Sequence, residues 1–213
     1  MTSPAPETNQ LAVEMRGIVK IFPGIVAMTV LFSAIFNGIE LIWDRQFGFL
    51  KETLVAPVPR VTIMIGRTLG GATTSVMQGL IVAVACIIVG FRPSSVTAIA
   101  GTLVFMVLIA VMFTALGTAI ASVLSDFQGF QMIMNFLVMP IFFLSGALFP
   151  LKGLPRTLDL IARIDPLSYG VDGLRSSMTG LSHFGLPTDF AVLSVLTVAL
   201  LLVGSRLFSK IQI

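Results

Sequence analysis

Charged residues are scarce in this chain of 213 residues. Asp, Glu, Lys and Arg together make up 11% of the sequence, whereas an ordinary soluble domain carries roughly 25%. Hydrophobic residues make up 56%, and the mean hydropathy is +1.01. A folded chain with so few charges has too little polar surface to face water on all sides. The composition therefore excludes an ordinary soluble protein and favours one that is covered by lipid.

The residue types that build catalytic and metal sites are also nearly absent. One cysteine, Cys86, and one histidine, His183, are too few for a disulfide framework or a conventional zinc site. We interpret Cys86 as a small core residue and His183 as a loop residue. The sequence contains no Gly-Lys dipeptide, which a phosphate-binding loop needs, and no Gly-x-Ser-x-Gly motif. We therefore expect no enzyme activity, no catalytic residue, no metal and no cofactor in this chain.

Long uncharged intervals are what the sequence has instead. They cover residues 21–39, 68–91, 93–125, 127–151 and 190–205, and a membrane-spanning helix needs about 20 apolar residues. The sequence predicts an all-α integral membrane protein with about five transmembrane helices, at residues 22–42, 60–90, 96–123, 127–149 and 190–208. Residues 1–20 are predicted to be a polar N-terminal segment, disordered up to residue 10, and residues 21–213 the transmembrane domain.

The most charged stretch follows the first predicted span. Trp43, Phe47, Leu50 and Leu54 recur at helical spacing, with Arg45, Lys51 and Glu52 on the other side. Pro57 and Pro59 end the pattern. We expect one short amphipathic helix near the membrane surface, weakened by Gly48.

A second polar region lies between the fourth and fifth predicted spans. Residues 154–161 and 167–178 each show a short amphipathic pattern, separated by Asp165 and Pro166. Asp172 and Arg175 are three residues apart, which allows a weak pair on the polar side of the second helix. We expect two short helices at the membrane interface.

The predicted spans hold no ionisable residue deep in the bilayer. Glu40 and Asp126 come nearest, and both lie at span ends, where an interfacial role is favoured over proton coupling. A protein that moves a solute uphill without such groups needs an energy source on another polypeptide. Counting Lys and Arg near the span ends gives six against seven, so charge bias leaves the orientation open.

Three segments resemble the ABC-2-type permeases, which are the membrane subunits of bacterial ABC exporters of the drug-resistance and polysaccharide-export type. They are residues 22–27 (FPGIVA), residues 44–60 (DRQFGFLKETLVAPVPR), and the set SGALFP, LP, PLSYG and DGLR within residues 145–175. The resemblance implies a cytoplasmic coupling helix that contacts the ATPase, with candidate residues Asp44, Arg45, Phe47, Leu50, Lys51, Glu52, Leu54 and Pro57. It also implies external re-entrant helices, with candidate residues Pro150, Pro166, Tyr169, Asp172 and Arg175.

The resemblance implies partners as well: an ABC ATP-binding subunit that holds ATP and Mg, a second permease copy or homologue, and membrane lipid, with no nucleic acid. The expected location is the cell (cytoplasmic or inner) membrane, and the expected substrate is an amphipathic drug, lipid or lipid-linked saccharide. Family members usually have six spans, so we expect this form to lack the usual first helix. The alternatives are a non-transporting scaffold or assembly subunit and a secondary transporter.

Overall fold

A computed structural model describes residues 6–55, 57–92, 95–124, 126–148 and 156–209. Within these ranges the chain is helical, with no strand. The helices are α1 (Pro6–Phe36), α2 (Gly38–Gln46), α3 (Phe49–Val55), α4 (Arg60–Ile88), α5 (Val96–Val123), α6 (Phe127–Leu144), α7 (Arg156–Ile164), α8 (Pro166–Thr179) and α9 (Leu186–Ser209). Five stretches are long and apolar enough to cross a membrane: Ile21–Gln46, Arg60–Ile88, Val96–Val123, Phe127–Leu144 and Leu186–Ser209. The predicted all-α membrane fold with five spans is confirmed.

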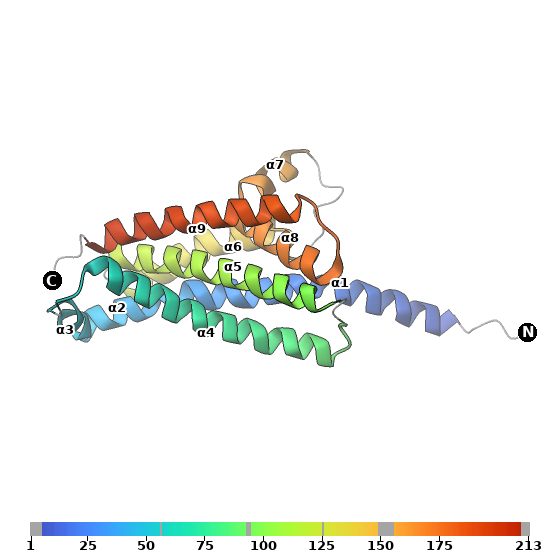
Figure 1. Ribbon diagram of the computed structural model, residues 1–213, viewed down its shortest axis with the longest axis horizontal. Coiled ribbons are helices and arrows are strands. Elements are labelled where there is room, and N and C mark those ends of the chain that lie inside the picture. Colours follow the sequence, from blue (N-terminus) through green and yellow to red (C-terminus); the bar gives the residue numbers. More distant parts are fainter. Residues whose placement is uncertain (1–5, 56, 93–94, 125, 149–155, 210–213) are drawn as a thin grey trace, which may run out of the picture.

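The long helices run side by side along one axis (Figure 1). Helix α5 lies at the centre and packs against α1, α4, α8 and α9. Helix α3 lies at one end of the bundle, near the end of α9, and α7 and α8 lie towards the other end (Figure 1). The two regions singled out in the sequence therefore occupy opposite ends of the molecule. We call them the α3 end and the α8 end.

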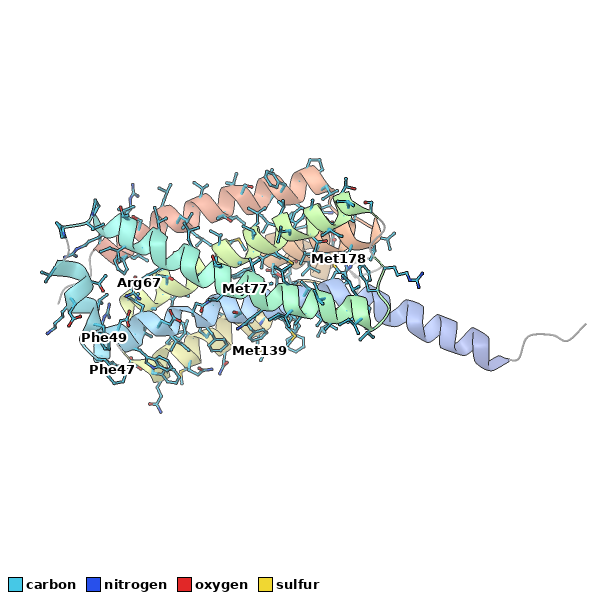
Figure 2. The ribbon with its side chains drawn as sticks, turned by 60° about the horizontal axis from the view of Figure 1, so that its bottom comes forward. Phe47, Phe49, Arg67, Met77, Met139 and Met178 are labelled. Carbon is cyan, nitrogen blue, oxygen red and sulfur yellow. The ribbon has the colours of Figure 1, made fainter. Side chains whose placement is uncertain are left out.

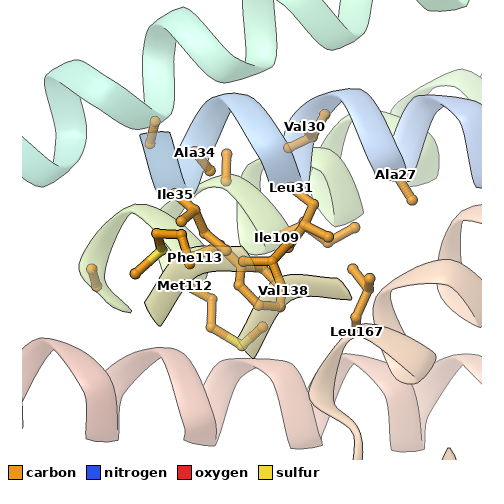
Figure 3. Close-up of a cluster of buried hydrophobic side chains, with 14 of the residues drawn as sticks. Ala27, Val30, Leu31, Ala34, Ile35, Ile109, Met112, Phe113, Val138 and Leu167 are labelled. Atoms are coloured by element: carbon orange, nitrogen blue, oxygen red, sulfur yellow. The ribbon is translucent and has the colours of Figure 1, made fainter. Parts of the chain in front are cut away.

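The core forms around α5 because this helix has both large apolar side chains and small residues that let its neighbours come close. Figure 3 shows Ile109, Met112 and Phe113 of α5 packed with Leu31 and Ile35 of α1. Val138 of α6 and Leu167 of α8 complete the same cluster. All seven side chains are at most 2% exposed. Their burial joins four helices that are far apart in the sequence.

One contact between α5 and the first span is made by backbone. A Cβ placed on Gly117 would lie 2.5 Å from the carbonyl oxygen of Ile35, and a Cβ on Gly38 would lie 2.6 Å from the carbonyl oxygen of Gly117. Helices approach this closely in membranes when small residues form the interface. Only glycine fits at these two positions without moving a helix.

The first span contains one irregular helical turn at Asn37. Helix α1 ends at Phe36 and α2 begins at Gly38, with Asn37 between them. The Asn37 amide Nδ2 donates to the carbonyl oxygen of Gly71 at 2.8 Å and to the hydroxyl of Ser75 at 3.0 Å. Asn37 is half-buried and bonds to α4, so this irregular turn is tied to a neighbouring helix.

Several predicted boundaries differ from the structure; for example, the fifth span begins at Leu186 rather than at residue 190. Residues 6–10 were expected to be disordered, but α1 begins at Pro6, so this part of the prediction is wrong. The polar composition of that segment does not prevent a helix that continues into the apolar span. The domain boundary predicted at residue 20 lies within α1, and the division into residues 1–20 and 21–213 stays a prediction. The fourth span ends at Leu144 rather than at residue 149, because a turn begins at Ser145.

Candidate functional site

The predicted amphipathic helix is two helices, and this corrects the sequence interpretation. Helix α2 ends at Gln46, and α3 begins at Phe49. Between them Gly48 has φ of +85°, a left-handed conformation that favours glycine and stops the preceding helix. Trp43 and Phe47 are therefore not on one continuous face with Leu50. Leu50 is 3% exposed and belongs to the core, whereas Phe47 is 72% exposed.

An exposed surface remains at the α3 end, which we call the α2–α3 surface. Phe47 and Phe49 lie together at this end of the bundle (Figure 2). Phe49 is 59% and Val55 81% exposed. The exposed members of the surface are Phe47, Phe49, Lys51, Glu52, Val55 and Pro57. Leu54 belongs to α3, but its side chain lies outside the described residues. Apolar side chains beside a cation and an anion are typical of a surface that binds another protein.

Arg45 does not belong to this outward surface, although the sequence placed it there. Its Nη1 donates to the carbonyl oxygen of Leu124 at 2.8 Å, and its Nη2 to that of Ser122 at 2.9 Å. These carbonyls lie at the C-terminal end of α5, where helix carbonyls lack partners within the helix and a positive charge is favourable. Arg45 therefore attaches α2 to the end of the central helix.

Asp44 also points back into the bundle. Its Oδ2 pairs with Nη2 of Arg67 on α4. The two side chains are 29% and 24% exposed, respectively, so the pair is partly shielded from water. The predicted coupling residues thus divide into two groups. Asp44, Arg45 and Leu50 fix the α2–α3 segment to α4, α5 and the core, and the exposed members are free to contact a partner.

At the α8 end, Asp165 and Pro166 start α8. Asp165 Oδ1 accepts the N–H of Leu167 at 2.9 Å, and its Oδ2 accepts the hydroxyl of Ser168 at 3.2 Å. Pro166 occupies the first turn, where its missing N–H is not needed. Burial raises the pKa of Asp165 to about 7, although the two hydrogen bonds lower it.

The Tyr169 hydroxyl donates to the carbonyl oxygen of Arg163 at 2.8 Å, which ties α8 to α7.

Asp172 and Arg175 were predicted as a weak pair on the polar side of α8; their charges do interact, but Asp172 is buried rather than exposed. Asp172 is 1% exposed and accepts the N–H groups of His183 and Phe184, each at 2.8 Å. Arg175 donates from Nη2 to the carbonyl oxygen of Gly146 at 2.7 Å. Asp172 is enclosed because α8 packs against α1, α5 and α9, whereas Arg175 is half-buried. Burial lowers the pKa of Arg175, and the charge of Asp172 opposes this shift.

Other predicted residues are found as follows. His183 lies in the loop between α8 and α9, as expected, with Nε2 3.2 Å from Oδ1 of Asp159. Its neighbour Asp159 also pairs with Arg163 at 3.0 Å, and these bonds lower the pKa of Asp159. Cys86 is buried, as expected. Pro150 lies outside the described residues.

Two polar residues that sequence reasoning missed are Asn37 and Asp189. Asp189 is 0% exposed, although its place in the first turn of α9 is typical of an exposed acidic residue at a helix start. Asn37 was hidden within an uncharged interval. A search for every polar residue capable of several hydrogen bonds, rather than for charges alone, would have found Asn37.

An apolar cavity of about 180 Å³ lies between α4 and α5 towards the α8 end. Its walls include Val84, Ile87, Phe91, Ile99, Leu103 and Met178. Among the described residues, no group of three or more His, Cys, Asp or Glu side chains could hold a metal ion. The lining of this cavity suits contact with an apolar group.

Comparison with known proteins gives a consistent result. A family model described as "ABC-2 type transporter" matches residues 5–179. The chain is 30% identical over 192 residues to the inner membrane transport permease YadH of Escherichia coli K12, covering 89% of this chain and 74% of the relative. It is 34% identical over 158 residues to the putative transport permease ycf38 of Pyropia yezoensis (71% and 53% covered). It is 23% identical over 189 residues to nodulation protein J of Rhizobium leguminosarum bv. viciae (88% and 72% covered).

Proposed function

The chain belongs to the ABC-2 type transporter family, and we propose that it is the membrane subunit of an ATP-driven exporter. It is a multi-pass transport permease of the inner membrane. We propose export as the direction of transport, a separate ATP-binding subunit as the motor, a second permease copy as the partner, and an amphipathic molecule as the substrate. ATP and Mg would be held by the motor subunit, with no cofactor in this chain.

The observation that carries the proposal is the α2–α3 segment. It presents exposed apolar and charged side chains on one side and is bonded to α4 and α5 on the other. A subunit that binds the α2–α3 surface and moves would therefore displace the ends of two spans. Because bonds from Arg45 and Asp44 lie between the surface and these spans, the movement would pass along the helices instead of being lost in a flexible loop.

The orientation that we propose for the chain rests on the family resemblance. The resemblance implies that the coupling helix is cytoplasmic, so the α8 end would face outward. The apolar cavity near the α8 end would accommodate the acyl or aromatic part of an amphipathic molecule. This supports a drug, lipid or lipid-linked saccharide as the substrate class.

Inside-out membrane vesicles test the proposal. Uptake of fluorescent amphipathic dyes and of a fluorescent phospholipid would be measured with ATP, without ATP, and with a proton ionophore. We expect uptake that requires ATP and survives the ionophore. The double charge reversal Lys51→Glu with Glu52→Lys should abolish it, because it alters the α2–α3 surface without touching the core. Arg92→Glu, an exposed reversal at the α8 end, is the matched control.

Two other outcomes would contradict the proposal. Uptake that needs no ATP and stops with the ionophore would identify a secondary transporter. A chain that inserts normally but changes neither the uptake of any probe nor the ATPase activity of the vesicles would identify a scaffold or assembly subunit.

A further inference from the structure

A second buried carboxyl group lies beside Asp172. Asp189 of α9 is 0% exposed, and no hydrogen-bond donor of the described residues reaches its Oδ1 or Oδ2. Among the described residues, the carboxyl of Asp172 on α8 is the group that interacts with the Asp189 side chain. An isolated buried carboxylate without a donor is very unfavourable. The charge state of this pair is therefore restricted by its surroundings.

Two ionised carboxylates have only acceptor atoms, so they form a hydrogen bond with each other only when one carries a proton. The hydrogen-bond donors around the pair show which of the two carboxyl groups carries the proton. Asp172 accepts the N–H groups of His183 and Phe184 and, at 3.2 Å, the hydroxyl of Ser182. Asp189 accepts none. Asp189, which no donor of the described residues reaches, is thus the member of the pair that carries the shared proton.

The surrounding charges agree with a single negative charge on the pair. Arg175 on α8 is the cation that acts on Asp172. His183 directs Nε2 towards Asp159 of α7, and Asp165 is occupied with the first turn of α8. The neighbouring spans contribute no charge, since residues 21–36 and 96–123 contain no Asp, Glu, Lys, Arg or His. Arg175 can thus offset one negative charge of the pair.

We propose that Asp172 and Asp189 form a proton-binding site that joins α9 to α8 at the α8 end of the bundle. The ligand is a proton rather than a metal ion, because Asp189 is fully buried and no third metal-binding side chain joins the pair among the described residues. Asp172 also holds the loop at residues 182–184. Loss of the proton would place two negative charges in contact and separate the start of α9 from α8 and this loop.

Infrared spectroscopy tests the site directly, because a protonated carboxyl group has a C=O stretching band that a carboxylate lacks. The purified chain would carry ¹³C-labelled aspartate, and spectra would be recorded at pH 6 in the Asp165→Asn background. That background removes the other aspartate that holds a proton near neutral pH. An ordinary aspartate, with a pKa of about 3.9, is almost fully ionised at pH 6.

We expect a band equivalent to one protonated aspartate per chain, which shifts in D₂O and is lost when Asp189→Asn is added. The control Asp126→Asn, at an exposed helix cap, should leave the band unchanged. A band of the same size in the Asp189→Asn protein would overturn the proposal. If the Asp189→Asn variant does not fold, the number of protonated aspartates per chain in the Asp165→Asn protein still tests the proposal. A value of zero would contradict the site. A stoichiometric metal ion found by elemental analysis, with no such band, would also overturn it.

Discussion

Arg45 donates a hydrogen bond from Nη1 to the backbone carbonyl oxygen of Leu124 at 2.8 Å, across 79 positions of sequence. This bond connects the end of α2 with the residue that follows the central helix α5. Together with the bond from Nη2 to Ser122, it makes the position of the α2–α3 surface depend on α5. The proposed coupling to an ATP-binding subunit depends on that connection.

Replacing Arg45 with lysine should therefore separate stability from coupling. A lysine ammonium lacks the planar fork that bonds two carbonyls at once. We expect the free energy of unfolding to fall by about 1.5–3 kcal/mol, the range for hydrogen bonds to a charged group. ATP-driven uptake should fall further than the amount of folded protein does. Uptake per folded chain equal to that of the wild type would show that the bond serves stability alone.

The Asp44–Arg67 pair allows a charge-swap test. Asp44→Arg and Arg67→Asp should each impair folding or uptake, because each places two like charges together at the junction of α2 and α4. The double variant should recover much of the loss, since it restores an opposite pair in the same place. Thermal stability in detergent and uptake would be measured for all four proteins. Additive losses in the double variant would mean that the two side chains do not interact in the folded protein.

Gly117→Ala should destabilise the bundle because the new methyl group would meet the carbonyl oxygen of Ile35. Overpacking of this kind costs about 1–3 kcal/mol. Gly70→Ala is the matched control, since a Cβ there has no atom within 4 Å and alanine favours the helix. Thermal unfolding in detergent should show a lower Tm for the first variant and an equal or higher Tm for the second. Equal losses in both would contradict the close contact between α1 and α5.

Asp165 gives a prediction for pH. Its pKa is raised to about 7 in the folded protein by burial, against about 3.9 in an unfolded chain. Between these values the folded state holds a proton that the unfolded state has lost, so stability falls as pH rises from about 4 to about 7 and then levels off. The shift corresponds to at most about 4 kcal/mol.

Asp165→Asn should remove this contribution while keeping the helix cap, because the amide oxygen still accepts the N–H of Leu167. Tm would be measured from pH 4.5 to pH 8 for both proteins. We expect the variant to lose less stability over this range and to be the more stable protein at pH 8. Parallel curves of Tm against pH for the two proteins would contradict the raised pKa of Asp165.

Much of the fold could be predicted because apolar length and helix caps are local properties. The third predicted span, residues 96–123, matches α5 at both ends. Ser95 caps its first turn by accepting the N–H of Ala98 at 3.1 Å. The family resemblance was visible for a related reason, since its motifs are continuous segments of sequence.

The parts that could not be predicted depend on tertiary contacts. Helical spacing placed Asp172 on a polar face, but spacing alone does not show that α8 is enclosed by three other helices. Arg45 looked like a surface charge until its bonds to the end of α5 were known. Gly48 was expected only to weaken a helix, and its positive φ divides it. In each case the deciding partner lies far away in the sequence or depends on a backbone angle.

The central claim is that the α2–α3 surface binds an ATP-hydrolysing subunit. The most direct measurement is purification of the tagged chain from native membranes in mild detergent, with bound proteins labelled by a photoreactive ATP analogue. The wild type should retain a labelled protein that contains a phosphate-loop motif. Phe49→Asp should lose it, and Ile164→Asp, an equally severe change at a 77% exposed position on α7, should retain it. Recovery of the labelled protein with Phe49→Asp at the wild-type level, or its absence from the wild type, would contradict the account.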